Sequence, residues 1–319
     1  MPGFYTHYLF GAMTFSKIKD KTTRKNLSTH KSVYTYGLQG PDFFFFFLPS
    51  YALHSGNLGS IMHERRTGAF LLHLLKGRNQ FSDSEDKAIA EAYILGFLGH
   101  YVLDSAAHPY IYDRSGYAFR KCQAYFSRHI ELETEIDSEL LDYYKHRKPS
   151  SFAQYRLLTL TPREDQVLSA LLSDALQKTY PEKFLQIPVL RMALWTMRAG
   201  TRFFYDKKGH KKPLVRSIES RFFNYYPISF MIPTDSPTDF PDATNVLHQT
   251  WKNPWAPDQI SKDSFYDIFE NAQTEYLCLI QQTGLLFQDD GNTYSTEKLA
   301  KWKNLVGNKS YHSGLPCEL

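Results

Sequence analysis

The chain has 319 residues, which allows one large domain or two ordinary ones and is ample for a real core. Hydrophobic residues make up 42% and charged residues 22%, so the composition is globular and not disordered. A net charge of +4 is too small to indicate a nucleic-acid-binding protein by itself. The three cysteines are widely spaced, which argues against a disulfide framework or a thiolate zinc site.

The sequence shows neither a membrane span nor a secretory signal. The strongest apolar stretches, 43–48 and 92–103, are far shorter than the about 20 residues that a membrane helix needs. The first residues lack a basic region followed by an apolar stretch. We therefore expect a cytoplasmic protein.

Helical patterns dominate the chain. Asp42 follows a Gly-Pro turn and is placed to begin a helix through the phenylalanine run 43–48. The strongest helix is predicted over 84–108, with Pro109 as its end. Further helices are predicted at 121–145, 161–176, 188–206 and 262–282, and an irregular segment at 222–260. Few stretches alternate with period two, so we predict an all-α protein.

A break in the pattern near 147–151 divides the chain into two portions, 1–150 and 151–319. The first portion carries many polar groups that would point inward and would need covering. We therefore predict that the second, helical portion packs on the first and that the two form one continuous domain.

Three polar residues recur at four-residue intervals in the apolar helix predicted at 84–108. His100, Asp104 and His108 would lie on one face, about 6 Å apart, which is a spacing that can share metal ions. A carboxylate buried between imidazoles is costly unless it is paired or bound to a metal. The alternative is a hydrogen-bonded His-Asp-His ladder without a metal.

The next predicted helix repeats this interval with His129 and Glu133. Two ligand-bearing helices that face each other make a metal site typical of helical bundles. The same helix has carboxylates about 200° away from this pair, which we expect to face solvent: Glu131, Glu135 and Glu139.

Further candidates lie nearer the N-terminus. His7 and Asp42 can contribute to the same site, although they can also be a core histidine and a helix cap. Either His54 or His63 can complete the set. The remaining histidines stand in charged or loop contexts and are expected to be solvated: His30, His146, His210 and His312. Histidines and carboxylates without cysteines suit zinc.

Several familiar catalytic motifs are missing from the sequence. His63-Glu64 begins like a zinc protease motif, but Thr67 stands where the second histidine would be needed. There is no Walker loop, no Gly-x-Ser-x-Gly elbow and no dinucleotide fingerprint.

The order and spacing of the whole set resemble the zinc-dependent phospholipase C family. The motifs that carry the resemblance are Thr6-His7, Gly40-Pro41-Asp42, His63, His100-x3-Asp104-x3-His108-Pro109 and His129-x3-Glu133. That family includes bacterial phosphatidylcholine-hydrolysing enzymes and the catalytic domain of clostridial alpha-toxin, and it is related in fold to the single-strand-specific zinc nucleases. The resemblance covers about residues 1–145.

The resemblance implies an all-α fold around two or three zinc ions. The implied ligands are Asp42, His63, His100 and Asp104 for one ion, with Asp104 bridging to a second, His108, His129 and Glu133 for another, and His7 at the site nearest the N-terminus. His54 is the rival of His63 for its place.

The implied reaction is metal-assisted hydrolysis of a phospholipid or related phosphodiester. Asp42 is expected to orient or deprotonate the attacking water, and Asp137 to hydrogen-bond a ligand histidine. Two alternatives stay open: a nuclease-like phosphodiesterase on the same cluster, and a non-catalytic protein stapled by zinc. A peripheral membrane contact is a further option. The aromatic segment 245–255 can touch a membrane surface or pack on the bundle as a loop, and the basic clusters 17–31 and 207–212 can attract anionic lipid or phosphate, although such clusters are usually solvated faces. No nucleic-acid or protein partner is evident.

Overall fold

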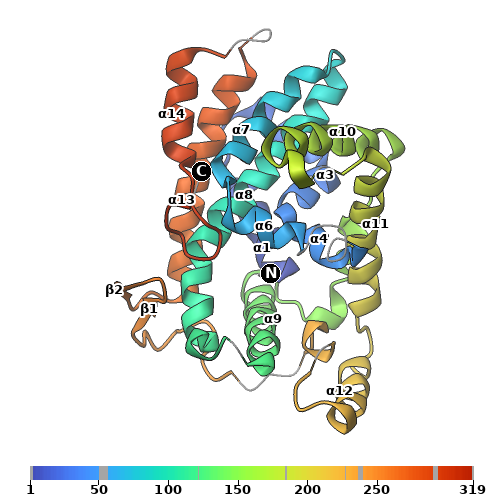
Figure 1. Cartoon of the computed structure of the whole chain (residues 1–319), viewed down its shortest axis with the longest axis vertical. Coiled ribbons are helices and arrows are strands. Elements are labelled where there is room, and N and C mark those ends of the chain that lie inside the picture. Colours follow the sequence, from blue (N-terminus) through green and yellow to red (C-terminus); the bar gives the residue numbers. More distant parts are fainter. Residues whose placement is uncertain are drawn as a thin grey trace.

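The computed structural model describes residues 3–49, 57–120, 122–183, 185–226, 228–235, 240–289 and 294–317. Helices make up nearly all of the regular structure in these ranges (Figure 1), which confirms the all-α prediction. The N-terminal portion contains α1 (Phe4–Lys17), α2 (Lys21–Thr29), α3 (Lys31–Gly37), α4 (Phe43–Phe46), α6 (Leu58–Glu64), α7 (Thr67–Gly77), α8 (Ser84–Ser115) and α9 (Gln123–Lys145). The C-terminal portion contains α10 (Pro162–Thr179), α11 (Ile187–Phe204), α12 (Lys211–Phe222), α13 (Phe265–Phe287) and α14 (Thr296–Val306).

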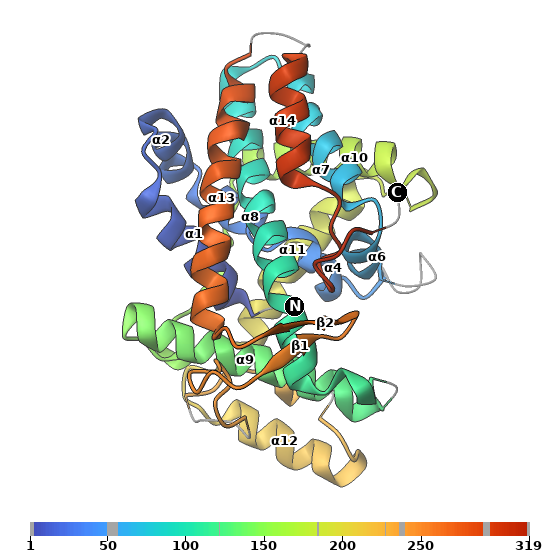
Figure 2. The same ribbon diagram turned by 90° about the vertical axis from the view of Figure 1, so that its left-hand side faces the viewer.

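The long helix α8 is the centre of the molecule, and other helices pack around it (Figures 1 and 2). Its N-terminus is capped by Asp83, whose side chain accepts hydrogen bonds from the N–H groups of Glu85 and Asp86. Gly116 ends the helix in a left-handed conformation, with φ at 85°. Most of the residues between these caps are buried.

Pro109 lies inside α8, so the prediction that it ends the helix is wrong. A proline cannot donate a hydrogen bond to the carbonyl four residues earlier, which is that of Ser105. The C-terminal segment packs closely on this carbonyl. A Cβ on Gly314 would lie only 2.5 Å from the Ser105 oxygen. One residue beyond the proline, the Tyr110 hydroxyl donates to the carbonyl of Ala243 at 2.6 Å. We attribute the helical continuation to this packing on both sides.

The helices α3 and α8 approach so closely that their backbones touch. A Cβ on Gly96 of α8 would lie 2.3 Å from the carbonyl oxygen of Tyr34, and one on Gly37 of α3 would lie 2.4 Å from that of Tyr93. Only glycine fits at these two positions without a shift of backbone. The contact brings the turn that follows α3, including the short 3-10 helix Gly40–Asp42, onto the middle of α8.

The C-terminal portion shares the core of the N-terminal portion. Helix α13 runs beside α8 (Figure 2), and the buried hydroxyl of Tyr276 donates to the carbonyl of Leu95 at 2.7 Å. The Tyr276 ring also stacks on Phe10 of α1, with ring centroids 5.4 Å apart. Helix α10 packs on both α7 and α8. The boundary near residue 150 stays a prediction.

The four later predicted helices lie where the pattern placed them. They correspond to α9, α10, α11 and α13. Helix α10 begins with a reciprocal capping box between Thr161 and Glu164. Helix α13 extends beyond the predicted end to Phe287, because Thr283 and Leu286 are still buried there.

The segment predicted to be irregular, 222–260, contains a short hairpin. Strand β1 (Trp251–Asn253) pairs antiparallel with β2 (Ala256–Ser261), and a register irregularity follows Lys252. The two strands form a small sheet on the side of α8 (Figure 2). Within the described ranges, no helix has both the length and the apolar character needed to cross a bilayer. The cytoplasmic location stays a prediction.

The predicted solvent exposure of the α9 carboxylates and of His30 is wrong. On α9, Glu131 and Glu135 are buried, and Glu139 is partly buried. Later segments cover this face, and Arg216 of α12 donates to Glu131 at 2.6 Å. His30 is also buried, with its ring nitrogens 3.5 Å from two glutamate oxygens. In both cases the covering residues come from distant parts of the chain.

Candidate metal centre

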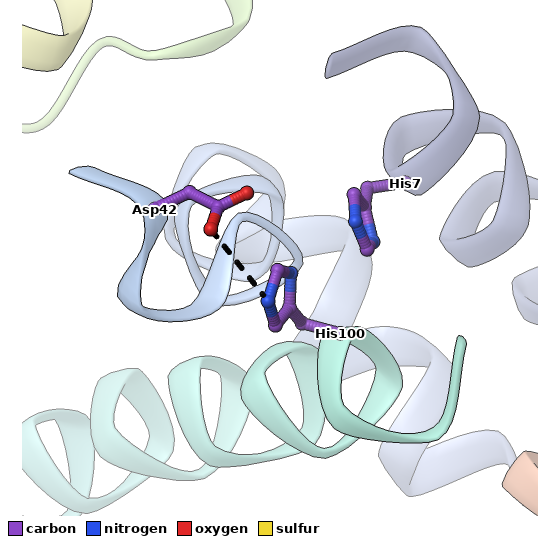
Figure 3. A group of neighbouring side chains, drawn as sticks. All are labelled: His7, Asp42 and His100. Carbon is purple, nitrogen blue, oxygen red and sulfur yellow. Dashed lines mark ion pairs between the residues drawn. The ribbon is translucent and has the colours of Figure 1, made fainter. Parts of the chain in front are cut away.

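Three segments meet at a buried group formed by His7, Asp42 and His100 (Figure 3). His7 comes from α1, Asp42 from the turn after α3, and His100 from the middle of α8. The two imidazole rings stack with centroids 4.3 Å apart, and Asp42 Oδ1 lies 4.0 Å from His100 Nε2. Each residue offers one ligand atom within 4.8 Å of the others.

A second group of potential ligands consists of His63, His100 and Asp104. Asp104 Oδ2 lies 3.3 Å from His63 Nε2 and 3.2 Å from His100 Nε2. The other oxygen of Asp104 lies 3.0 Å from Nε2 of His7, and His63 Nε2 lies 3.2 Å from Asp42 Oδ1. Asp104 therefore joins the second group to the first.

The third group brings α8 and α9 together through His108, His129 and Glu133. Glu133 Oε1 lies 3.5 Å from His108 Nε2 and 3.1 Å from His129 Nε2. His108 Nδ1 is also 3.6 Å from Asp104 Oδ2. All eight residues predicted from the sequence thus lie in one continuous, buried cluster, and Asp104 is at its centre.

Backbone carbonyl groups fix the orientation of the imidazole rings. Nδ1 of His63 donates to the carbonyl of Gly59 at 2.7 Å, and Nδ1 of His100 donates to that of Leu38 at 3.2 Å. A carbonyl can only accept, so Nδ1 carries the proton in both rings. In the neutral ring the lone pair is then on Nε2, which faces the carboxylates. Metal-binding histidines are oriented in this way.

The buried polar atoms of the cluster fit a bound cation. Both oxygens of Asp42 and of Asp104, and Nε2 of His63 and of His100, have no hydrogen-bond partner among the described residues. Buried acceptors that face one another are costly unless a positive charge lies between them. Either shared protons or metal ions supply such a charge. Nitrogen and oxygen donors without sulfur suit zinc.

The electrostatics of the cluster also favour positive charge. Burial alone would raise the pKa values of Asp42 and Asp104, but nearby imidazoles, above all that of His100, lower both below their usual range. Burial alone would lower the pKa of His63, but its contacts with Asp104 and Asp42 raise it to about 9. The two carboxylates are therefore ionised at neutral pH, as metal ligands must be.

Among the described residues no hydrogen bond joins Asp137 to a ligand histidine, so its predicted role is wrong. Its carboxylate accepts hydrogen bonds from the backbone N–H of Tyr5 at 3.0 Å and of Thr6 at 2.6 Å, and from the Thr6 hydroxyl at 2.6 Å. A Cβ on Gly3 would lie 1.8 Å from Asp137 Oδ2, so glycine is needed there. Asp137 thus fixes the first turn of α1, which carries His7.

His312 is the residue of the site that the sequence analysis missed. The sequence places it in a loop expected to be solvated, but its ring stacks on that of His63 at 5.3 Å and lies 5.7 Å from that of His108. Its Nδ1 shares a hydrogen bond of 2.8 Å with the Tyr112 hydroxyl. No motif marks His312, and only the folded C-terminal segment brings it to the cluster.

The rival of His63 lies outside the described residues. His54 falls in 50–56, whereas His63 is on α6 within the cluster. The assignment of each of the eight residues as a metal ligand stays a prediction.

Aromatic rings stand at the edge of the third group. Tyr112 lies 4.6 Å from the His129 ring and 4.9 Å from Trp255, and Trp255 is 4.6 Å from Tyr117, all between ring centroids. Trp255 is partly exposed, and so is His312. These residues lie where the buried cluster approaches the surface.

Comparison with known proteins places this cluster in a family. The sequence pattern described as zinc dependent phospholipase C matches residues 6–177. The match covers more than half of the chain and contains all eight residues of the cluster. The protein therefore belongs to the zinc-dependent phospholipase C family, which confirms the resemblance seen in the sequence. No curated protein and no solved structure matches the chain.

Proposed function

We propose that the protein is a zinc-dependent phosphodiesterase of the phospholipase C type. Its substrate is a phospholipid or a related phosphodiester, and the bond that breaks joins the phosphate to the glycerol. The observation that carries the proposal is the continuous cluster of eight buried histidines and carboxylates, in a chain of this family. Its three groups of potential ligands support the proposal of two or three ions.

The three groups of the cluster are the proposed zinc sites. Asp104 contacts four imidazoles, so it is the residue that would be shared between neighbouring sites. When bound, zinc at such sites neutralises the charge of the phosphate oxygens and makes a water acidic enough to ionise near neutral pH. The carbonyls of Gly59 and Leu38 hold the His63 and His100 rings in place for this purpose.

Asp42 is the proposed base. Water attacks phosphorus, its proton passes to the Asp42 carboxylate, the bond from phosphorus to the glycerol oxygen breaks, and that oxygen leaves with a proton from solvent. Asp42 Oδ1 faces His63, while neither of its oxygens has a hydrogen-bond partner among the described residues. Its side chain does not cap α4, and it is therefore available to the cluster.

His312 is proposed to bind a substrate oxygen. Burial, together with the nearby His63 and His108, lowers its pKa well below the usual value, so the ring is neutral. When the Tyr112 hydroxyl donates to Nδ1, the proton of the ring is on Nε2. That nitrogen lies 3.7 Å from Glu64 Oε1, and in the proposal it leaves this contact to donate to an oxygen of the phosphodiester at the edge of the cluster.

A second candidate is a nuclease-like phosphodiesterase. The rings of Tyr112, Tyr117 and Trp255 beside the third group favour it, because aromatic rings stack on bases. The same rings can also hold a quaternary ammonium head group. Assays with a phospholipid and with single-stranded DNA distinguish the two candidates.

The test measures zinc per chain by mass spectrometry, together with hydrolysis of phosphatidylcholine in micelles and of single-stranded DNA. We expect two or three zinc ions and release of diacylglycerol. Asp42→Asn should lower the rate at least about 100-fold and keep at least the zinc of the His108 group. Asp142→Asn, at an exposed ion pair with Lys148, is the matched control and should behave as wild type.

The outcomes distinguish the proposed enzyme from a nuclease and from a protein in which zinc is only structural. A wild-type protein that binds no zinc refutes the proposal. Zinc binding without hydrolysis of either substrate supports a structural role, and cleavage of DNA alone supports the nuclease.

A further inference from the structure

The segment 187–226, which lies beyond the family match, is strongly basic. It contains nine Lys and Arg residues against two acidic residues, a net charge of +7, although the whole chain carries only +4. It comprises α11, a connecting loop and α12, which follow one another along one edge of the molecule (Figure 1). Three of these cations are paired with acidic groups outside the segment, Arg191 with Asp165 and both Lys212 and Arg216 with Glu131. The other six form no ion pair with a described residue, so positive charge is still concentrated here.

Both acidic residues of this segment are turned inward. Asp206 accepts hydrogen bonds from the backbone N–H of Lys211 at 2.7 Å and of Lys212 at 3.1 Å. Glu219 accepts from the N–H of Ile228 at 2.6 Å and of Ser229 at 3.2 Å. Both side chains are buried, so they do not neutralise the surface.

Large apolar side chains are exposed among these charges. On α12, Leu214, Ile218 and Phe222 recur at four-residue intervals and are 63%, 50% and 74% exposed. They form one apolar stripe on the outer side of the helix. Lys207 and Lys208 lie in the loop before α12, and both are exposed with no ion pair to a described residue.

Helix α11 continues the same combination. Trp195 is 63% exposed, and Phe203 is similarly exposed two turns later. Arg198 and Arg202 lie between and beside them and are also exposed. We call the following exposed residues the basic apolar surface: Trp195, Arg198, Arg202, Phe203, Lys207, Lys208, Leu214, Ile218 and Phe222.

An exposed apolar stripe flanked by Lys and Arg is suited to the surface of a lipid bilayer. A helix of this kind lies in the plane of a bilayer with its apolar side chains among the head groups, and its cations attract anionic lipids. Tryptophan is favoured at such an interface because one end of its ring is apolar and the other can hydrogen-bond. We propose that the basic apolar surface binds a bilayer that contains anionic phospholipid.

This surface is joined to the metal centre through α9. Arg216 of α12 donates to Glu131 of α9, and the Ser127 hydroxyl donates to the carbonyl of Tyr226 at 3.0 Å. Ser127 is two residues before His129. A bilayer bound to α12 would therefore be connected to the helix that carries two of the proposed ligands. The binding itself needs no metal, so the inference goes beyond the proposed function.

The test is co-sedimentation of the full-length protein with vesicles of phosphatidylcholine, with and without phosphatidylserine. We expect binding to the anionic vesicles, weaker binding in high salt, and a blue shift of tryptophan emission that Trp195→Phe diminishes. Lys207→Glu with Lys208→Glu should weaken binding about 30-fold or more, since each surface cation contributes about fivefold at an anionic bilayer. The control, Lys301→Glu with Lys303→Glu on exposed positions of α14, should not.

A second pair of variants tests the apolar stripe. Ile218→Ser with Phe222→Ser should also release the protein, whereas Ile260→Ser, at a 65% exposed position of β2, should not. Loss with the charge reversal but not with the serine variants would indicate a simple polyanion site and overturn the inference. The inference would also be overturned by equal binding of all variants, by no binding to any vesicle, or by a dimer that buries the basic apolar surface.

The variant Asp42→Asn keeps this test separate from the proposed function. It should sediment with anionic vesicles as wild type does. Vesicle binding by a protein that hydrolyses no substrate leaves the inference standing and refutes the enzyme. Hydrolysis of short-chain soluble lipid without vesicle binding supports the enzyme and refutes the inference.

Discussion

Replacing Gly96 with alanine should separate α3 from α8. The new Cβ would lie 2.3 Å from the carbonyl oxygen of Tyr34 and 2.9 Å from Cα of Gly37. Both are backbone atoms, so no side chain can move aside, and the helices must part by about 1 Å to restore ordinary contacts. The hydrogen bond from His100 to Leu38 spans the same two segments and should lengthen as well.

The expected cost follows from two opposing terms. Overpacking of a close contact costs about 1–3 kcal/mol, and the upper end applies where backbone must move. Alanine returns about 1 kcal/mol because it favours the helix more than glycine does. We therefore expect Gly96→Ala to lower the free energy of unfolding by about 2 kcal/mol.

The assay is urea-induced unfolding followed by circular dichroism, with a chelator present so that zinc does not contribute. Gly284→Ala is the matched control, since its Cβ on α13 would meet only Thr23 Oγ1 at 3.8 Å. This control should gain about 0.5–1 kcal/mol. If Gly96→Ala is stabilised to the same extent, the backbone contact between α3 and α8 is not as described. Zinc retention in the absence of chelator should also be weaker in Gly96→Ala than in the control.

Three further predictions concern metal, helix position and pH. Removal of zinc with phenanthroline should lower the free energy of unfolding by at least about 3 kcal/mol at saturating metal, measured by thermal denaturation, and an unchanged midpoint would contradict a metal centre. Asp137→Ala should cost about 2–4 kcal/mol in urea and release the zinc nearest His7, because the N–H groups of Tyr5 and Thr6 lose their acceptor. Asp83 has a pKa lowered by hydrogen bonds from the N–H groups that follow it and by Arg163, so the stability it contributes is present above about pH 4 and lost as the pH falls further. The melting temperature of Asp83→Asn should accordingly fall less steeply with acid than that of wild type, and parallel curves would rule out this role.

The part of the site that could be predicted is the part that repeats locally. His100, Asp104 and His108 lie one turn apart on a single helix, so their common face follows from helical geometry alone. The same holds for His129 and Glu133. Periodicity fixes such positions because the partners are neighbours in sequence.

The parts that were missed depend on contacts between distant segments. His312 reaches the cluster only because the C-terminal segment packs on α8, and Pro109 stays helical because Gly314 and Ala243 contact its surroundings. Glu131 is buried by Arg216, which is far along the chain. No pattern within a short window carries information on such partners, so sequence periodicity could not have found them.

The scattered origin of the cluster has a kinetic consequence. His7, Asp42, His63 and His312 come from separate elements, and the loops between them must close before the cluster exists. Contacts of such long range form late, after the entropy of loop closure has been overcome by other parts of the core. Interactions made only after the folding transition state slow unfolding and leave the folding rate unchanged. A metal bound here would therefore slow the unfolding of the native protein and prolong its lifetime, without accelerating its folding.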